Sequence, residues 1–188
     1  SLYISAFRWD GLGRKLFVGL DNYINLITDD HVFLMATRNN LVWTFLTIVF
    51  TVFVSLMLAT LLNREFIGRT LFRGIMYFPF ILSGIVVALV WRWIYHHQLG
   101  FLNAFLQMLG LEDLTRAWLS DPGIALYAVY VSALWRGVGG PMILFLAGLQ
   151  TIPRECLEAA AIDGSGRLST FIRIIIPMLR ETFVVVLA

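Results

Sequence analysis

Long uncharged runs of apolar residues dominate the hydrophobic pattern of this chain. The first run extends from Leu41 to Leu62 and ends at Asn63 and Arg64. A helix over this run, rising about 1.5 Å per residue, measures about 33 Å, which is enough to cross the roughly 30 Å hydrocarbon core of a bilayer. The pattern therefore predicts a membrane-spanning helix over 41–62.

Three further apolar segments predict further spans, at about 74–93, at about 123–150 and from 182 onward. Pro79 lies inside the second segment, where it is expected to kink the helix because proline has no amide donor. We therefore expect an all-α fold, a polytopic integral membrane helical bundle. The whole sequence, 1–188, is expected to form one transmembrane domain that is truncated at both ends.

The connecting segments are more polar. Residues 1–40 predict an aqueous or interfacial segment with short helices near Asp21–Ile27 and His31–Thr37. The amphipathic stretch 100–110 is too short to cross a bilayer, and it fits either an interfacial helix or a packed loop helix. His96 and His97 are adjacent and have no third ligand nearby, so we expect two interfacial histidines and no metal site.

The basic residues predict the orientation of the chain. Seven of the 14 lysines and arginines lie in the segments 63–73 and 151–181, and five lie in 1–40 and 94–122. Positive charge is enriched in cytoplasmic loops. The first two segments are therefore expected in the cytoplasm and the other two outside it.

The composition agrees with a lipid environment. Hydrophobic residues make up 59% of the chain and charged residues 14%, whereas soluble domains carry about 25% charged residues. The net charge of +2 is too small to indicate a nucleic-acid partner. The single cysteine, Cys156, excludes an intramolecular disulfide within this sequence and disfavours a cysteine-based zinc site.

The segment 151–181 predicts a structured cytoplasmic loop. Pro153 suits a helix start, and Arg154–Ile162 is rich in helix formers. Gly164 permits a turn with positive φ, and a second helix is expected from about Arg167. This helix–turn–helix could present carboxylates to a partner protein, or it could merely reverse the chain.

This loop resembles the signature loop of permease subunits of bacterial binding-protein-dependent ABC importers. The matching residues are Glu158, Ala159, Ala160, then Gly164 after three residues, and Ile174, Ile176 and Pro177 after nine more. Asp163 is also typical of the family. Ile176 stands where the family usually has leucine, which is a conservative departure.

The resemblance covers nearly the whole chain and points to the carbohydrate-uptake branch. The segments that carry it are GLDNYINLI (19–27), NREFIGRTLFRGIMYFP (63–79), VVALVWRWIYHHQLGFLNAFL (86–106) and FLAGLQTIP (145–153). It implies a permease of about six spans in the bacterial cytoplasmic (inner) membrane, with the first and last spans outside this sequence. The expected solute is a sugar or a sugar-like compound.

The resemblance also implies partners. The loop 154–177 would dock on a dimer of ABC ATPase subunits, a second permease subunit would complete the membrane domain, and an extracytoplasmic solute-binding protein would deliver solute. ATP would be bound by the partner, so no cofactor is expected in this chain. The implied coupling residues are Glu158, Ala159, Ala160, Asp163, Gly164, Ile174 and Pro177.

Arg136 is a second candidate site because it lies near the middle of the predicted span 123–150. A charged residue there is costly and usually faces a protein interior or an aqueous cavity. Gly139 and Gly140 follow it and could open the helix beside a cavity. These three residues form either a translocation-path site or a place where Arg136 caps a half-helix or reaches the outer interface.

A polar seam in the first span, a secondary transporter or channel, and a membrane enzyme are further possibilities. Trp43, Thr44, Thr47, Thr51 and Ser55 could line a polar path, although hydroxyl residues at such spacing often pack helices together. A secondary transporter or channel would need coupling carboxylates within the spans, and none of the predicted spans contains Asp or Glu. A membrane enzyme would need a buried nucleophile or metal cluster, and neither stands out in the sequence. The sequence also has no G-x-x-x-x-G-K-[ST] phosphate loop, so ATP binding of that kind is not expected in this chain.

Overall fold

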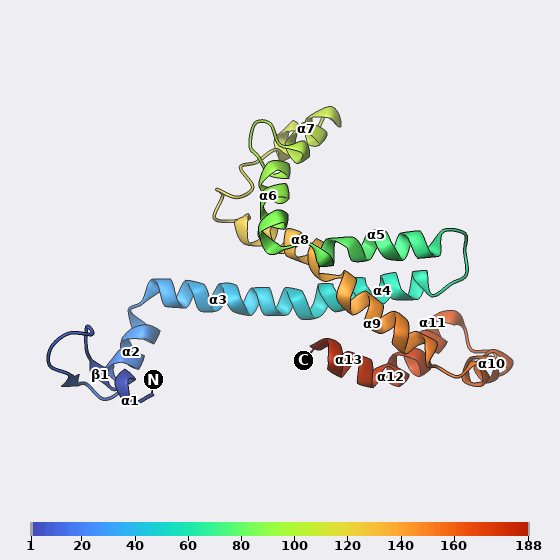
Figure 1. Cartoon of the computed structure of the whole chain (residues 1–188), viewed down its shortest axis with the longest axis horizontal. Helices are drawn as coiled ribbons and strands as arrows, with labels where there is room; N and C mark the ends of the chain where they lie inside the picture. Colours follow the sequence, from blue (N-terminus) through green and yellow to red (C-terminus); the bar gives the residue numbers. More distant parts are fainter. Residues whose placement is uncertain (1, 188) are drawn as a thin grey trace. The chain divides into compact units, whose positions relative to one another are not determined.

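The computed structural model describes residues 2–187, which are mostly helical; within this range the strands form one short hairpin (Figure 1). These residues form two compact units, one up to Phe45 and the other from Leu46 onward. The single domain expected over 1–188 thus contains two units.

The first unit is small and is organised around a hairpin. Its elements are α1 (Leu2–Ser5), β1 (Phe7–Arg8), β2 (Leu16–Phe17), α2 (Asp21–Thr28) and most of α3 (His31–Leu46). The strands are antiparallel, with Phe7 opposite Phe17. The amide of Asn22 in α2 donates to the carbonyls of Ser5 (2.8 Å) and Phe7 (3.1 Å), which ties α2 to the hairpin.

The second unit contains the remaining helices. In chain order they are η1 (Thr47–Thr51, π-helical), α4 (Val52–Leu62), α5 (Arg69–Ile81), α6 (Gly84–Ile94), α7 (Phe101–Met108), η2 (Glu112–Leu114, 3₁₀), α8 (Ala125–Gly137), α9 (Gly139–Gln150), α10 (Arg154–Ile162), α11 (Arg167–Thr170), η3 (Phe171–Ile175, π-helical), α12 (Ile176–Met178) and α13 (Arg180–Leu187).

The first apolar run belongs to a longer helix than the sequence pattern predicted. α3, η1 and α4 form a continuous helix of 32 residues, His31–Leu62. The prediction of a separate short helix near His31–Thr37 was therefore wrong. No glycine or proline interrupts His31–Leu62, so the polar residues after Thr37 continue the helix instead of ending it.

The second apolar segment is broken, and the break is not at its proline. α5 and α6 meet at an angle of 101°. Pro79 is buried inside α5, which continues to Ile81. Leu82 and Ser83 are extended, and the Ser83 hydroxyl accepts from the amide of Val86 (3.4 Å) as the N-cap of α6. A helix end followed by a new N-cap therefore replaces the expected proline kink within 74–93.

The third apolar segment is also bent, by 44° between α8 and α9. By length and composition, residues 2–187 contain one helix able to cross a membrane alone, and up to three spans if each bent pair counts as one. The fourth predicted span, from 182 onward, is represented by α13 and stays a prediction.

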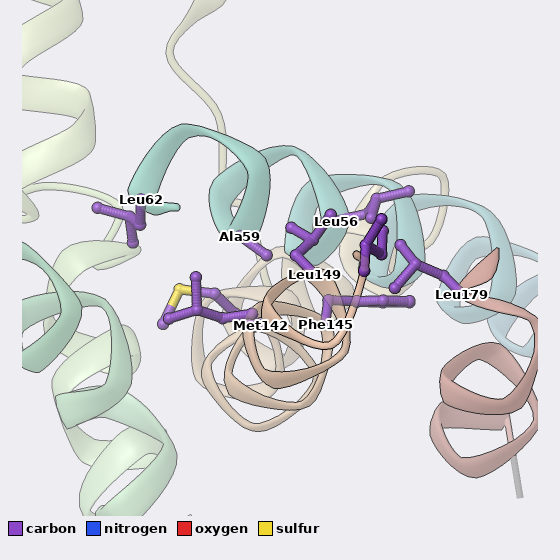
Figure 2. Close-up of a cluster of buried hydrophobic side chains, with 9 residues drawn as sticks. Leu56, Ala59, Leu62, Met142, Phe145, Leu149 and Leu179 are labelled. Atoms are coloured by element: carbon purple, nitrogen blue, oxygen red, sulfur yellow. The ribbon is translucent and has the colours of Figure 1, made fainter. Parts of the chain in front are cut away.

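The core of the second unit lies between α4 and α9 (Figure 2). Ala59 of α4 and Met142 and Phe145 of α9 have no exposed surface. Leu179, between α12 and α13, closes the cluster and is 1% exposed. In lipid, such close packing itself drives helix association, because apolar burial from water contributes little there.

Large apolar side chains also cover much of the outer surface. Ile85 is 76% exposed and Trp93 is 80% exposed, both on α6. Soluble monomers rarely expose contiguous apolar patches of more than a few hundred Å². These faces suit contact with lipid or with other membrane helices.

Candidate functional site

The predicted helix–turn–helix loop is present, and its first helix has the predicted bounds. α10 covers Arg154–Ile162, with Pro153 in an extended conformation as its N-cap. At the other end, the amide of Ser165 donates to the carbonyl of Ala160 (2.9 Å), and that of Gly164 donates to Ala161 (3.1 Å). Gly164 has φ +74°, the left-handed conformation that favours glycine at a helix end.

The second helix of the loop starts at Arg167, as predicted. The Thr170 hydroxyl donates to the Ser165 hydroxyl (3.1 Å), and the Thr170 amide donates to the carbonyl of Gly166 (2.9 Å). These bonds hold the turn against the first turn of α11. The loop is therefore a folded element, not a flexible linker.

The small residues of α10 fall on two different faces. Ala160 is 6% exposed and packs inside the chain, whereas Ala159 is exposed. The methyl group of Ala160 faces the protein's own interior, so the ATPase contact predicted for this residue stays a prediction. It fixes α10 in place, and the outward face is left to neighbouring residues.

Two carboxylates lie on the outward face of the loop. Glu158 and Asp163 are exposed. Among residues 2–187, neither side chain has a hydrogen-bond or ion-pair partner; the ion pairs present are Arg69–Glu65 and Arg116–Asp121. Free carboxylates beside a rigid turn are available to the basic side chains of another protein.

The end of the motif coincides with a change of helical winding. Ile174 is half-buried in η3, and Pro177 is exposed in α12. Proline cannot donate the usual i→i−4 bond, and a local π-helical adjustment is one way for a helix to satisfy the freed carbonyl groups. The π-helical turn was not predicted, although Pro177 was its signal in the sequence.

Arg136 lies in α8 and reaches the break between α5 and α6. Its Nε donates to the carbonyl of Leu82 (3.1 Å), a group left without a helical partner where α5 ends. This contact matches the capping interpretation of Arg136. Arg136 as a residue is exposed, and its role in a translocation path stays a hypothesis.

Gly139 and Gly140 lie against α5. A Cβ atom added at Gly139 would stand 2.9 Å from the carbonyl oxygen of Met76 and 3.0 Å from the Cα of Tyr77. One added at Gly140 would stand 2.8 Å from the ring of Phe80. Close packing against α5 thus gives a structural reason for both glycines. Their role in a translocation path stays a prediction.

Hydroxyl residues of the first long helix face α8 and α9. The Ser55 hydroxyl is fully buried and donates to the carbonyl of Val138 (3.0 Å). Tyr130 donates to the carbonyl of Leu46 (2.7 Å), and its oxygen lies 3.3 Å from the Thr51 hydroxyl. Thr51 and Ser55 thus serve helix packing, whereas Tyr130 was missed because its own stretch of sequence carries no signal.

Comparison with known proteins identifies the relatives of this architecture. Residues 51–188 match the family model described as "Binding-protein-dependent transport system inner membrane component". The chain is 37% identical to the probable ABC transporter permease protein YurN of Bacillus subtilis (strain 168) over 184 residues, covering 96% of this chain and 63% of that protein.

Two further similarities agree. The multiple sugar-binding transport system permease protein MsmF of Streptococcus mutans serotype c is 37% identical over 178 residues, which cover 94% of this chain and 60% of MsmF. A chain in the crystal structure of a bacterial alginate ABC transporter, in complex with an alginate pentasaccharide-bound periplasmic protein, superposes with a TM-score of 0.79 at 26% identity. The superposition covers 90% of this chain and 58% of that one.

The chain spans about 60% of the length of these curated relatives. The family match covers the second compact unit, from Thr51 in its π-helical turn onward, and so includes both bent helix pairs and the helix–turn–helix loop. On this evidence, the chain belongs to the family of binding-protein-dependent transport system inner membrane components.

Proposed function

We propose that the full protein is the membrane-spanning permease subunit of an ATP-driven importer for a sugar or sugar-like solute. The observation that carries this proposal is the folded loop 154–177, in which Glu158 and Asp163 are exposed and unpaired beside the Gly164 turn. A rigid loop with free carboxylates at the membrane surface suits docking on a cytoplasmic ATPase dimer.

The loop is mechanically connected to the core. Leu157 of α10 and Phe171 and Ile175 of η3 pack against the buried cluster between α4 and α9. A displacement of α10 is therefore passed to α9 through packed side chains, not through a flexible linker. ATP at the partner and solute in the membrane domain would then bias one inward–outward equilibrium.

The proposed partners follow from the family and its relatives. MsmF is named for a multiple sugar-binding transport system, and the alginate transporter was crystallised with a periplasmic protein that holds an oligosaccharide. By extension, we assign to this protein a second permease subunit, an extracytoplasmic solute-binding protein and a carbohydrate solute. The exposed apolar surface of α6 suits lipid or the second permease.

ATP is assigned to the partner, and no cofactor is assigned to this chain. The sequence contains no G-x-x-x-x-G-K-[ST] phosphate loop of the kind that binds nucleotide phosphates. The chain would thus contribute the path and the coupling contact, whereas the ATPase dimer would carry out hydrolysis.

Transport assays on the complete complex test this proposal. Right-side-out vesicles that contain the complete complex are loaded with or without ATP. They are then exposed to radiolabelled mono- and oligosaccharides, together with the solute-binding protein of the complex. We expect uptake of at least one sugar only with ATP on the cytoplasmic side. ATP-independent uptake driven by an ion gradient would support a secondary transporter instead.

Substituting a coupling carboxylate sharpens the test. Glu158→Gln removes a charge from the outward face of α10, and we expect roughly a tenfold loss of transport, typical of one interfacial charge contact. Glu112→Gln, in the segment predicted to lie outside the cytoplasm, is the matched control and should leave transport unchanged. Equal effects of the two variants would remove Glu158 from the coupling contact.

A further inference from the structure

A cavity lies between the end of the first long helix and the helix–turn–helix loop. Its volume is about 530 Å³. Thr60 and Arg64, at the end of the first long helix, line one side. The other side is lined by residues of α10, of the turn that follows it, of α11 and of η3: Leu157, Ala161, Ser165, Arg167, Thr170, Phe171 and Ile175. Neither Glu158 nor Asp163 is among the residues that line it, so the carboxylates of the proposed coupling contact do not account for this cavity.

Two arginines face this cavity without a protein partner. Arg69, in the preceding cytoplasmic segment, pairs with Glu65, and Arg73 donates to the carbonyl of Leu62 (2.8 Å). In contrast, within residues 2–187 the side chains of Arg64 and Arg167 have no carboxylate or hydrogen-bond partner. No acidic residue is among the lining residues described by the structure, so the cavity is positive.

The other residues that line the cavity are of two kinds: some carry hydroxyl groups, and others form an apolar wall. The Thr170 hydroxyl in α11 donates a hydrogen bond of 3.1 Å to the hydroxyl of Ser165, in the turn that precedes this helix. Phe171 and Ile175 are half-buried and pack on the α4–α9 core. A small inorganic anion would leave this apolar wall in contact with water, whereas a ligand with both a phosphate and an acyl-glycerol part would cover it.

The depth of the cavity also favours a lipid. Arg64 lies two residues after the apolar run that ends at Leu62, so it is at the level where head groups begin. The arginine distribution places this end of the helix on the cytoplasmic side. Basic pockets between membrane helices on that side are suited to anionic head groups.

From these observations we propose that the cavity binds the phosphate-bearing head group of an anionic phospholipid of the cytoplasmic leaflet. Arg64 and Arg167 would hold the phosphate from opposite walls, the hydroxyls of Ser165 and Thr170 would complete the polar end, and Phe171 and Ile175 would cover the glycerol and upper acyl chain. Because the cavity joins α4 to the loop, a bound lipid would brace the coupling loop against the core.

Lipid binding tests the proposal on the complete transporter complex. The complex is purified in detergent and titrated with phosphatidylglycerol, with phosphatidylcholine and with inorganic phosphate, and bound lipid is counted by native mass spectrometry. The variant Arg64→Gln/Arg167→Gln removes both cavity charges. The control Arg154→Gln/Arg173→Gln removes two exposed loop arginines that do not line the cavity. Ala161→Phe fills the cavity without changing its charge.

The proposal predicts a selective loss. Phosphatidylglycerol should bind roughly 10- to 30-fold more weakly to the double cavity variant, since each arginine near a membrane surface contributes about a fivefold factor. Ala161→Phe should also weaken binding, whereas the control should match the wild type. Phosphatidylcholine should bind weakly to all forms, and millimolar phosphate should not compete.

Three results would overturn it. Equal losses in the cavity variant and the control would mean diffuse surface attraction, and full competition by phosphate would mean a free-anion site. Binding of phosphatidylglycerol only after the ATPase has been removed would mean that an acidic side chain of the ATPase occupies the cavity. None of these results requires transport, so they leave the proposed function to be judged separately.

Discussion

Single small side chains set how closely the helices of the second unit approach. At Gly139 the backbone of α5 comes so near that a Cβ atom would stand 2.9 Å from the Met76 carbonyl oxygen. Gly137, only two residues away, has no atom within 4 Å of such a Cβ. Two neighbouring glycines therefore differ in physical role, a difference that the sequence alone does not reveal.

This contrast gives a test at the residue scale. Gly139→Ala should destabilise the protein by about 1–3 kcal/mol, because the added methyl group meets backbone atoms that cannot rotate away. Gly137→Ala should leave the stability unchanged or slightly higher, since alanine favours helix. Thermal unfolding of the detergent-solubilised complex measures both. Equal stability of the two variants would contradict the close approach of α9 to α5.

The buried hydroxyl of Ser55 offers a second test. Ser55→Ala removes the donor to the Val138 carbonyl at the bend between α8 and α9. We expect a loss of about 0.5–1.5 kcal/mol, the range for interhelical hydrogen bonds in membranes. Ser132→Ala is the control, because that hydroxyl bonds to Val129 within its own helix. A Ser55 variant as stable as the control would exclude the proposed packing role.

At the scale of elements, the break between α5 and α6 depends on a distant helix. Leu82 follows the last residue of α5, and its carbonyl accepts a hydrogen bond from Arg136 of α8. We expect Arg136→Leu to impair transport about tenfold by leaving that carbonyl unsatisfied within the membrane. Arg136→Lys keeps the charge and should restore part of the activity. Uptake assays at matched expression decide this, and full activity of Arg136→Leu would remove the residue from both candidate roles.

The turn between α10 and α11 requires a residue that can adopt a positive φ. Gly164 has φ +74°, and a β-branched residue there costs about 1–2 kcal/mol. Gly164→Val should therefore distort the loop and reduce ATP hydrolysis stimulated by the solute-loaded binding protein. Gly166→Ala, at φ −68° with open space around it, is the matched control. Normal stimulation in Gly164→Val would mean that the turn does not shape the coupling contact.

At the scale of the whole molecule, the sequence predicted local features better than contacts. Local properties of the sequence predicted three features. Hydrophobicity predicted the helix over 41–62, helix propensity predicted the bounds of Arg154–Ile162, and the glycines of the turn predicted a second helix from Arg167. Three other features depend on packing between helices: the break at Leu82, the π-helical turn at Thr47–Thr51 and the burial of Ala160. No pattern along the chain encodes these contacts.

The predicted orientation is also a property of the whole molecule. In a Cys156→Ser background, Gln98→Cys should react with a membrane-impermeant maleimide in right-side-out vesicles, because the segment 94–122 is expected outside the cytoplasm. Glu155→Cys should react only after permeabilisation. Both positions are exposed in the structure. The reverse labelling pattern would invert the topology and place the helix–turn–helix loop away from any cytoplasmic partner.

The most direct test of the account is affinity purification of the full-length protein from gently solubilised native membranes, followed by mass spectrometry of its partners. The account predicts recovery of an ABC ATPase and a second permease subunit, with the ATPase lost in Glu158→Gln and Gly164→Val and retained in Glu112→Gln and Gly166→Ala. Intact protein that is recovered alone, and that still catalyses uptake in vesicles without ATP, would contradict the importer assignment.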